Sequence, residues 1–126
     1  MDALGHVNNA TYLTYFETAR LAYFQHVGVD ELWDEVQGPI MARAELNYKM
    51  ALVPQHRIEV STRVSRLGRS SITLEHAIFL EGEETVAADA LIVAVWCNYN
   101  EGRSLPLPEN IRRNIQDFEG EGLILG

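Results

Sequence analysis

The sequence has only one cysteine, few basic residues and no long apolar run. Its single Cys97 excludes a disulfide within the chain and, with no secretory segment recognisable, predicts a cytoplasmic protein. Ten basic residues against 18 acidic ones give a net charge of -8. This charge argues against nucleic acid and anionic membrane surfaces as partners, because both attract basic proteins. The longest nearly continuous apolar stretch, Val86 to Trp96, contains Asp89 and is too short to span a bilayer as a helix.

The composition is typical of one folded domain. With 126 residues, 47% of them hydrophobic, the chain is long enough to bury a core. We find no internal repeat, no low-complexity tract and no sign of a second domain. Residues 1–126 are therefore expected to form a single domain.

Apolar side chains recur at helical spacing near the start of the chain. The pattern predicts a helix from about Asn9 to His26, and Gly28 supplies a stop signal. At ~1.5 Å per residue this helix is about 25 Å long, which matches the width of a sheet of several strands. The stripe expected to face the core consists of Tyr12, Phe16, Ala19, Tyr23 and Val27.

The rest of the chain has mostly the two-residue period of strands. A half-buried strand is predicted from Ile40 to Tyr48, and an antiparallel meander is predicted over 58–65, 72–80 and 85–99. The last strand is apolar on both faces, which indicates a second covering layer or a partner subunit. A short helix follows from about Pro108 to Phe118. The sequence thus predicts an α+β domain whose sheet wraps one long helix. In the predicted strand from Ile40 to Tyr48, the side chains of Ile40, Ala42, Ala44, Leu46 and Tyr48 should lie on one face.

The segment from Asp2 to Asn9 places a carboxylate just before the long helix. The start of a helix has unpaired N–H groups and partial positive charge, which stabilise a developing oxyanion. A nearby aspartate can act as general base or nucleophile. The pattern therefore indicates acyl chemistry, although an ordinary turn followed by an asparagine cap has the same residue types.

The same segment carries a family resemblance. Residues 2–10 (DALGHVNNA), together with Tyr12, Tyr15, Phe16, Glu17 and Arg20, resemble the hotdog-fold thioesterases of the 4-hydroxybenzoyl-CoA thioesterase type. Segments 44–48, 57–65, 68–71 and 105–108 follow in the order that this family has. The resemblance implies a hotdog fold, with the family's first strand missing here. It also implies hydrolysis of acyl-coenzyme A (acyl-CoA) thioesters by a homodimer or a dimer of dimers, without a metal or redox cofactor.

The resemblance identifies Asp2 with the catalytic carboxylate of the family. We expect Asp2 to activate water, and direct attack to give a mixed anhydride stays open. Glu17 is the alternative, because a second hotdog lineage uses a glutamate on this helix. A pair between Glu17 and Arg20, three residues later, is the competing structural interpretation.

The residues between Asp2 and the helix complete the predicted catalytic segment. Backbone N–H groups from Val7 to Ala10 are expected to polarise the thioester carbonyl. His6 is expected to orient the loop through a hydrogen bond, with acid–base catalysis as its alternative role. Asn8 and Asn9 are interpreted as the helix cap and its neighbour, and a substrate contact stays open. Gly5, His6, Val7, Asn8 and Asn9 are therefore grouped with Asp2 and Glu17 as catalytic candidates.

An acidic protein that binds coenzyme A must concentrate its basic charge. Arg63, Arg66 and Arg69 cluster at the predicted hairpin, and arginine suits phosphate geometry. The resemblance suggests that this turn, with Ser70 and Ser71, approaches the nucleotide or pantetheine across a subunit boundary. Simple solvation of the surface by these arginines is the competing interpretation.

Aromatic residues are the candidates for the acyl pocket. We expect Tyr12 and Tyr48 to contact the acyl group, with Tyr15, Phe16 and Met50 nearby. A metal site is not expected, because His26, His56 and His76 show no ligand spacing with each other or with Cys97.

Two other functions remain open at this stage. The fold could bind or sense acyl-CoA without hydrolysing it, since fold alone does not decide function. A hotdog dehydratase fits less well, because its paired Asp and His belong to a different motif.

Overall fold

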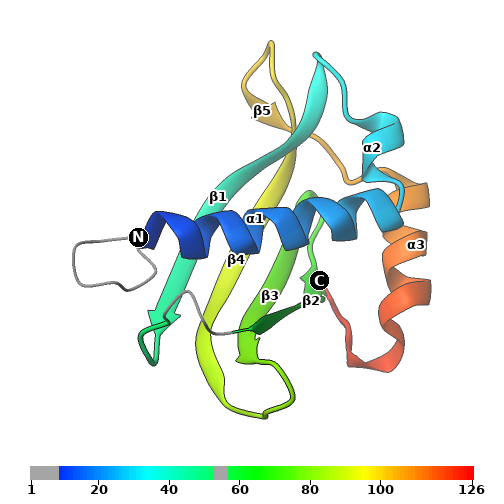
Figure 1. Cartoon of the computed structure of the whole chain (residues 1–126). Helices are drawn as coiled ribbons and strands as arrows, with labels where there is room; N and C mark the ends of the chain where they lie inside the picture. Colours follow the sequence, from blue (N-terminus) through cyan, green and yellow to red (C-terminus); the bar gives the residue numbers. More distant parts are fainter. Residues whose placement is uncertain (1–8, 53–56) are drawn as a thin grey trace.

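The computed structural model describes residues 9–52 and 57–126. A long helix lies across one face of an antiparallel sheet, and two shorter helices lie near the C-terminal end of the long helix (Figure 1). The elements are α1 (Asn9–His26), α2 (Val29–Leu32), β1 (Gln37–Tyr48), β2 (Ile58–Leu67), β3 (Ser71–Leu80), β4 (Val86–Asn98), β5 (Arg103–Ser104), α3 (Glu109–Glu119), a 3-10 turn (Gly120–Gly122) and β6 (Ile124–Leu125).

The sheet has the strand order β1-β4-β3-β2-β6, with β5 paired to β4. The meander β2–β3–β4 is antiparallel, as the sequence predicts, whereas β6 pairs parallel to the end of β2. The α+β architecture and the long helix against the sheet are thus confirmed. Among the described helices, none is long and apolar enough to cross a membrane.

Helix α1 begins and ends where the sequence predicts. Tyr12, Phe16, Tyr23 and Val27 are buried, whereas Ala19 is partly exposed. Gly28 follows with φ 87°, a left-handed conformation that glycine adopts without steric cost. Apolar side chains outside the predicted stripe include Phe24, which is buried, and two that stay exposed, Leu13 (45%) and Leu21 (42%).

The predicted single face of β1 is wrong. A β-bulge at Ala42 adds one residue to the strand relative to β4. Ile40 therefore pairs with Val95, whereas Ala44 pairs with the buried Ile92. Neighbouring positions of β4 alternate between the two faces of the sheet, so Ile40 and Ala44 point to opposite faces.

Strand β1 is also far more exposed than predicted. It is an edge strand that pairs only with β4 in the described part of the chain, and Gly38 is its one buried residue. Ile40 and Met41 are 47% and 54% exposed. Within one chain, β1 is therefore not the half-buried strand that its alternation predicts.

Gly38 is required by close packing at the start of β1. A Cβ there would lie 2.4 Å from both Trp33 Cδ1 and Tyr99 Oη. The Tyr99 hydroxyl donates to the carbonyl of Pro39 at 3.0 Å. These contacts fix the segment after α2 against the end of β4.

Strand β4 is buried on one face only within the described chain. Ala90, Ile92 and Ala94 are buried on the side of α1, whereas Leu91 and Val93 on the opposite side stay partly exposed. The prediction of two buried faces is therefore not met by this chain alone. A partner subunit over the second face stays a prediction.

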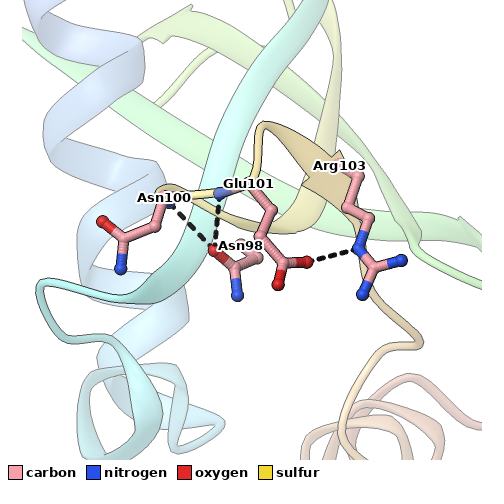
Figure 2. Close-up of polar contacts among 4 residues, drawn as sticks. All are labelled: Asn98, Asn100, Glu101 and Arg103. Carbon is pink, nitrogen blue, oxygen red and sulfur yellow. Dashed lines mark hydrogen bonds and ion pairs between the residues drawn. The ribbon is translucent and has the colours of Figure 1, made fainter.

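The turn between β4 and β5 is held by one asparagine side chain. Asn98 Oδ1 accepts hydrogen bonds from the backbone N–H groups of Asn100 and Glu101, both at 2.9 Å, and the Glu101 carboxylate pairs with Arg103 (Figure 2). After β5 the chain runs back along the sheet, where the N–H of Leu105 donates to the Trp96 carbonyl.

Helix α3 closes the end of the molecule near the C-terminus of α1, and its bounds confirm the predicted short helix to within one residue. Ile111 and Ile115 are fully buried. The Glu119 carboxylate accepts hydrogen bonds from the Tyr23 hydroxyl and from the Val64 N–H. One side chain at the end of α3 thus links α1 and β2.

Candidate active site

The structure describes one residue of the predicted catalytic segment, Asn9, which begins α1. Asp2, Gly5, His6, Val7 and Asn8 lie outside the described residues. The first turn of α1 carries no acidic residue. Its partial positive charge is therefore not neutralised from within the turn.

Tyr12 fixes the first turns of α1 to the chain that follows β1. Its ring is buried, its hydroxyl donates to the Met50 carbonyl at 3.3 Å, and the Leu52 N–H donates to the same hydroxyl at 3.2 Å. The ring of Tyr48 meets it edge-on, with centroids 5.0 Å apart. The two predicted acyl-contact residues thus lie together, and Tyr48, which is 45% exposed, is the one that solvent reaches.

A pocket of about 170 Å³ lies between α1 and the edge strand β1, beside Trp33, the residue that follows α2. Its walls are largely apolar, and they include the exposed Leu21 and Met41. Glu17 and Arg20 are its charged residues. Glu17 lies about 12 Å along the helix axis from Asn9, since the rise is ~1.5 Å per residue. The further lining residues are Phe24, Trp33, Pro39, Ile40 and Ala94.

Glu17 and Arg20 do not form the direct ion pair that their spacing suggests. The ion pairs of the described residues do not include either side chain, and neither side chain makes a hydrogen bond there. Burial lowers the pKa of Arg20, and the Glu17 charge opposes this effect by raising it. The two residues therefore interact electrostatically, and both line the pocket from the side of α1.

His76 is a buried polar residue, for which the sequence predicts a place on the apolar face of its strand and no metal site. It is 2% exposed, and a hydrogen bond of 2.9 Å joins its Nδ1 to Thr62 Oγ1. Its Nε2 has no hydrogen-bond partner among the described residues, and the Phe16 ring lies 5.5 Å away. Burial, and secondly the charge of Arg20, lower the pKa of His76 to about 4. His76 is therefore neutral at pH 7, and the sequence signal for it was a polar residue at an inward position of β3.

The three arginines of the β2–β3 hairpin differ in whether an acidic side chain pairs with them. Arg63 pairs with Glu75 at 3.2 Å, so its charge is partly compensated. Arg66 is exposed and takes part in no ion pair of the described chain. Arg69 Nη1 lies 3.4 Å from the Ser70 hydroxyl, to which it donates.

The hairpin that carries these arginines is held firmly in place. Arg112 of α3 donates to the Gly68 carbonyl at 2.7 Å, and the N–H of Trp96 donates to the Ser70 carbonyl at 2.8 Å. The Gly68 N–H donates to the Ser71 carbonyl and closes the turn. The predicted hairpin is confirmed, and any ligand would meet a fixed turn.

A second cavity, of about 530 Å³, lies mainly on the sheet face opposite α1. Its acidic residues are all paired: Glu75 with Arg63, Glu45 with Arg43, and Asp89 with both Lys49 and Asn47. Because these charges compensate each other and lie away from the start of α1, we do not assign the reaction to this cavity.

Comparison with known proteins decides the family. Residues 1–115 match the model of the thioesterase-like superfamily. The chain belongs to this superfamily. The expected hotdog fold and thioester hydrolase are thereby confirmed at the level of the family, while the roles of individual residues stay predictions.

Three relatives illustrate the match. A thioesterase from Thermus thermophilus, solved in complex with coenzyme A and Zn, is 41% identical, with a TM-score of 0.82 over 96% of this chain and 86% of that chain. The long-chain acyl-CoA thioesterase FadM of Escherichia coli is 26% identical over 94% of this chain and 90% of its own length. The YsmA protein of Bacillus subtilis is 28% identical over 75% of this chain, and the match spans 64% of YsmA.

Proposed function

We propose that this protein hydrolyses acyl-CoA thioesters to a free carboxylic acid and coenzyme A. FadM is an acyl-CoA thioesterase, and the similar Thermus structure is a thioesterase complexed with coenzyme A. These relatives support a CoA-linked substrate.

The observation that carries the proposal is the start of α1. The helix begins at Asn9 without an acid in its first turn, and Tyr12 anchors it through two hydrogen bonds. An anchored helix start can hold N–H donors in a fixed place where negative charge develops. In other enzymes, one such donor contributes roughly 3 kcal/mol to transition-state stabilisation.

In the proposed reaction, Asp2 takes a proton from water while the water oxygen attacks the thioester carbon. The N–H groups around Val7 to Ala10 stabilise the oxyanion of the tetrahedral intermediate. When the carbon–sulfur bond breaks, the CoA thiolate leaves and takes up the proton that Asp2 accepted from water, which restores the carboxylate. Direct attack by Asp2, followed by hydrolysis of the anhydride, is the alternative route to the same products.

For coenzyme A itself, we propose the β2–β3 hairpin as the contact. Arg66 and Arg69 offer charges that no acid of the described chain neutralises, whereas Arg63 is shared with Glu75. Ser70 and Ser71 add hydroxyl groups at the same turn. Guanidinium groups suit phosphate oxygens geometrically.

We also propose that the enzyme works as a homodimer or a dimer of dimers. The free edge of β1 and the exposed Met41 and Leu21 beside it support this proposal. An open strand edge with apolar side chains is a surface that a second chain can cover.

The test is release of free thiol from a panel of acyl-CoA substrates of different chain length. We expect turnover by the unaltered protein and a loss of 100-fold or more in Asp2→Asn, because an amide neither accepts the proton nor attacks the carbonyl. Glu17→Gln serves as the matched comparison and should retain most of the activity. Absence of thiol release on every substrate would refute the hydrolysis. Full activity of Asp2→Asn would refute the catalytic role of Asp2. Loss of activity confined to Glu17→Gln would assign the catalytic carboxylate to Glu17 instead.

A further inference from the structure

One buried tyrosine lies in the first turns of α1. Tyr12 is 3% exposed, and it is the one buried side chain from Thr11 to Tyr15. It lies three residues after Asn9, which is less than one helical turn from the start of the helix. The position of the helix start relative to the sheet therefore depends strongly on what Tyr12 contacts.

The Tyr12 hydroxyl makes two hydrogen bonds to the chain that follows β1. It donates to the Met50 carbonyl at 3.3 Å and accepts from the Leu52 N–H at 3.2 Å. Both distances are at the long end of the range for hydrogen bonds, so each bond contributes modestly. Together they use the donor and one acceptor site of the hydroxyl. A hydroxyl that is buried and bonded in this way is poorly placed to contact an acyl group.

The segment that Tyr12 contacts is itself fixed to the sheet. The N–H groups of Lys49 and Met50 both donate to the Ala87 carbonyl, at 2.8 and 3.1 Å. Leu52 is 1% exposed. Since Ala87 belongs to β4, an interior strand, the start of α1 is connected to the middle of the sheet. All these contacts lie within one chain, so they do not depend on a second copy at the β1 edge.

We propose that Tyr12 is a positioning residue for thioester hydrolysis and not a contact of the acyl group. Its hydroxyl holds the first turn of α1 in a fixed place, so that the N–H groups at the helix start stay aimed at the position where the oxyanion forms. Small displacements of such donors cost much of the rate, because their effect depends on a fixed geometry. This inference rests on the proposed hydrolysis, and it reassigns one of the two tyrosines predicted to contact the acyl group.

The kinetics of Tyr12→Phe separate the two roles. Phenylalanine keeps the ring and its packing, but the loss of the hydroxyl removes both hydrogen bonds. A positioning role predicts that kcat falls ten-fold or more, by the same factor for every acyl-CoA, while KM changes less than two-fold. A role in acyl binding predicts instead that KM rises by an amount that depends on the acyl group, with kcat nearly unchanged.

Tyr23→Phe is the matched control on the same helix. Tyr23 is 6% exposed, and its hydroxyl donates to Glu119. It lies about 16 Å along the helix axis from Tyr12, since the rise is ~1.5 Å per residue. Tyr23→Phe weakens a link of the fold far from the helix start, so it should lower the stability but keep the kcat and KM of the unaltered protein. An equal loss of kcat in both variants would mean that general destabilisation lowers the activity, and it would overturn the positioning role.

Amide hydrogen exchange tests the anchoring without turnover. The amides of the first hydrogen-bonded turn, residues 13–16, should lose protection at least ten-fold in Tyr12→Phe and much less in Tyr23→Phe, because this turn opens locally. If Tyr12→Phe does not fold, the unaltered protein supplies the test. Its Leu52 N–H, which donates to the Tyr12 hydroxyl, should exchange as slowly as the amides of this turn. A Leu52 amide that exchanges ten-fold faster would show that the hydroxyl does not hold the two segments together.

Two further results would overturn the assignment of Tyr12. Unchanged protection of the first turn in Tyr12→Phe would show that the hydroxyl does not fix the helix start. Loss of protection with an unchanged kcat would show that the reaction does not need a fixed helix start. Either result leaves the proposed hydrolysis standing, whereas absence of thiol release by the unaltered protein would refute the hydrolysis and, with it, the catalytic consequence of Tyr12.

Discussion

Contacts that cannot be read from spacing in the sequence determine where single residues of this protein lie. His76 stands at an inward position of β3, between apolar residues, so its burial follows from the alternation. Its bond to Thr62 and the nearby charge of Arg20 come from other elements, 14 residues away in sequence for Thr62. The site on α1 is similar: the spacing of Glu17 and Arg20 is visible in the sequence, but it does not show that they form no direct ion pair in the described chain.

The lowered pKa of His76 predicts a specific dependence of stability on pH. The folded-state pKa of about 4 lies below the ordinary value near 6.5, so the unfolded chain binds more protons between these two values. The contribution of His76 to the unfolding free energy should therefore be fully present above about pH 6.5 and should be lost as the pH drops toward 4. From pH 7 to pH 5 the contribution of His76 is about 1–2 kcal/mol.

Chemical denaturation at pH 7 and pH 5 checks this prediction. The loss of unfolding free energy over this interval should be smaller in His76→Gln than in the unaltered protein, since glutamine does not titrate. The carboxylates common to both proteins contribute equally and cancel in the comparison. An identical loss in the two proteins would mean that His76 is not held neutral by its surroundings.

At the scale of elements, periodicity predicted the long helices and strands, α1, α3 and β1–β4, but not the short α2, β5 and β6. Bulges also limited what periodicity could show about which face a side chain occupies. The apolar side chains at 40, 42, 44, 46 and 48 keep a perfect two-residue period in the sequence. The bulge at Ala42 changes the face without breaking that period, because the extra residue is itself part of the alternation. In β2, by contrast, the inward positions change from even to odd numbers between Val64 and Leu67, so a bulge there is visible in the sequence.

The link between α3 and the rest of the fold gives a prediction at this scale. Glu119→Ala removes the acceptor of both the Tyr23 hydroxyl and the Val64 N–H. Leaving buried donors unsatisfied costs ~1–3 kcal/mol each, so we expect a loss of about 2–4 kcal/mol in unfolding free energy. Denaturant titration measures it, with Glu121→Ala as the control because that side chain is exposed and unpaired in the described chain. Equal stability of the two variants would mean that Glu119 does not link these elements.

At the scale of the whole molecule, apolar surface remains uncovered at the β1 edge and on both faces of the sheet. The edge of β1, the exposed Leu21 of α1 and the partly exposed face of β4 leave apolar surface that a single chain does not cover. The sequence indicated this through the doubly apolar β4, but could not show that β1 would be the strand left at the edge. The order of the strands in the sheet depends on which strands pair, and neither the composition nor the periodicity of the sequence indicates that pairing.

The open edge of the sheet predicts self-association through β1. Met41 is 54% exposed in the single chain, so Met41→Asp should leave the fold intact while placing a charge in the proposed contact. We expect a dimer or tetramer mass for the unaltered protein in light scattering, and a shift toward monomer for Met41→Asp. Leu125→Asp, which changes a residue 58% exposed on β6, is the matched control and should keep the assembled mass. If the acyl-CoA site needs a second copy, thiol release by Met41→Asp should fall in proportion to the loss of assembled protein. Leu125→Asp should keep both its assembly and its thiol release. A monomeric unaltered protein with full activity would contradict the self-association and its role in activity.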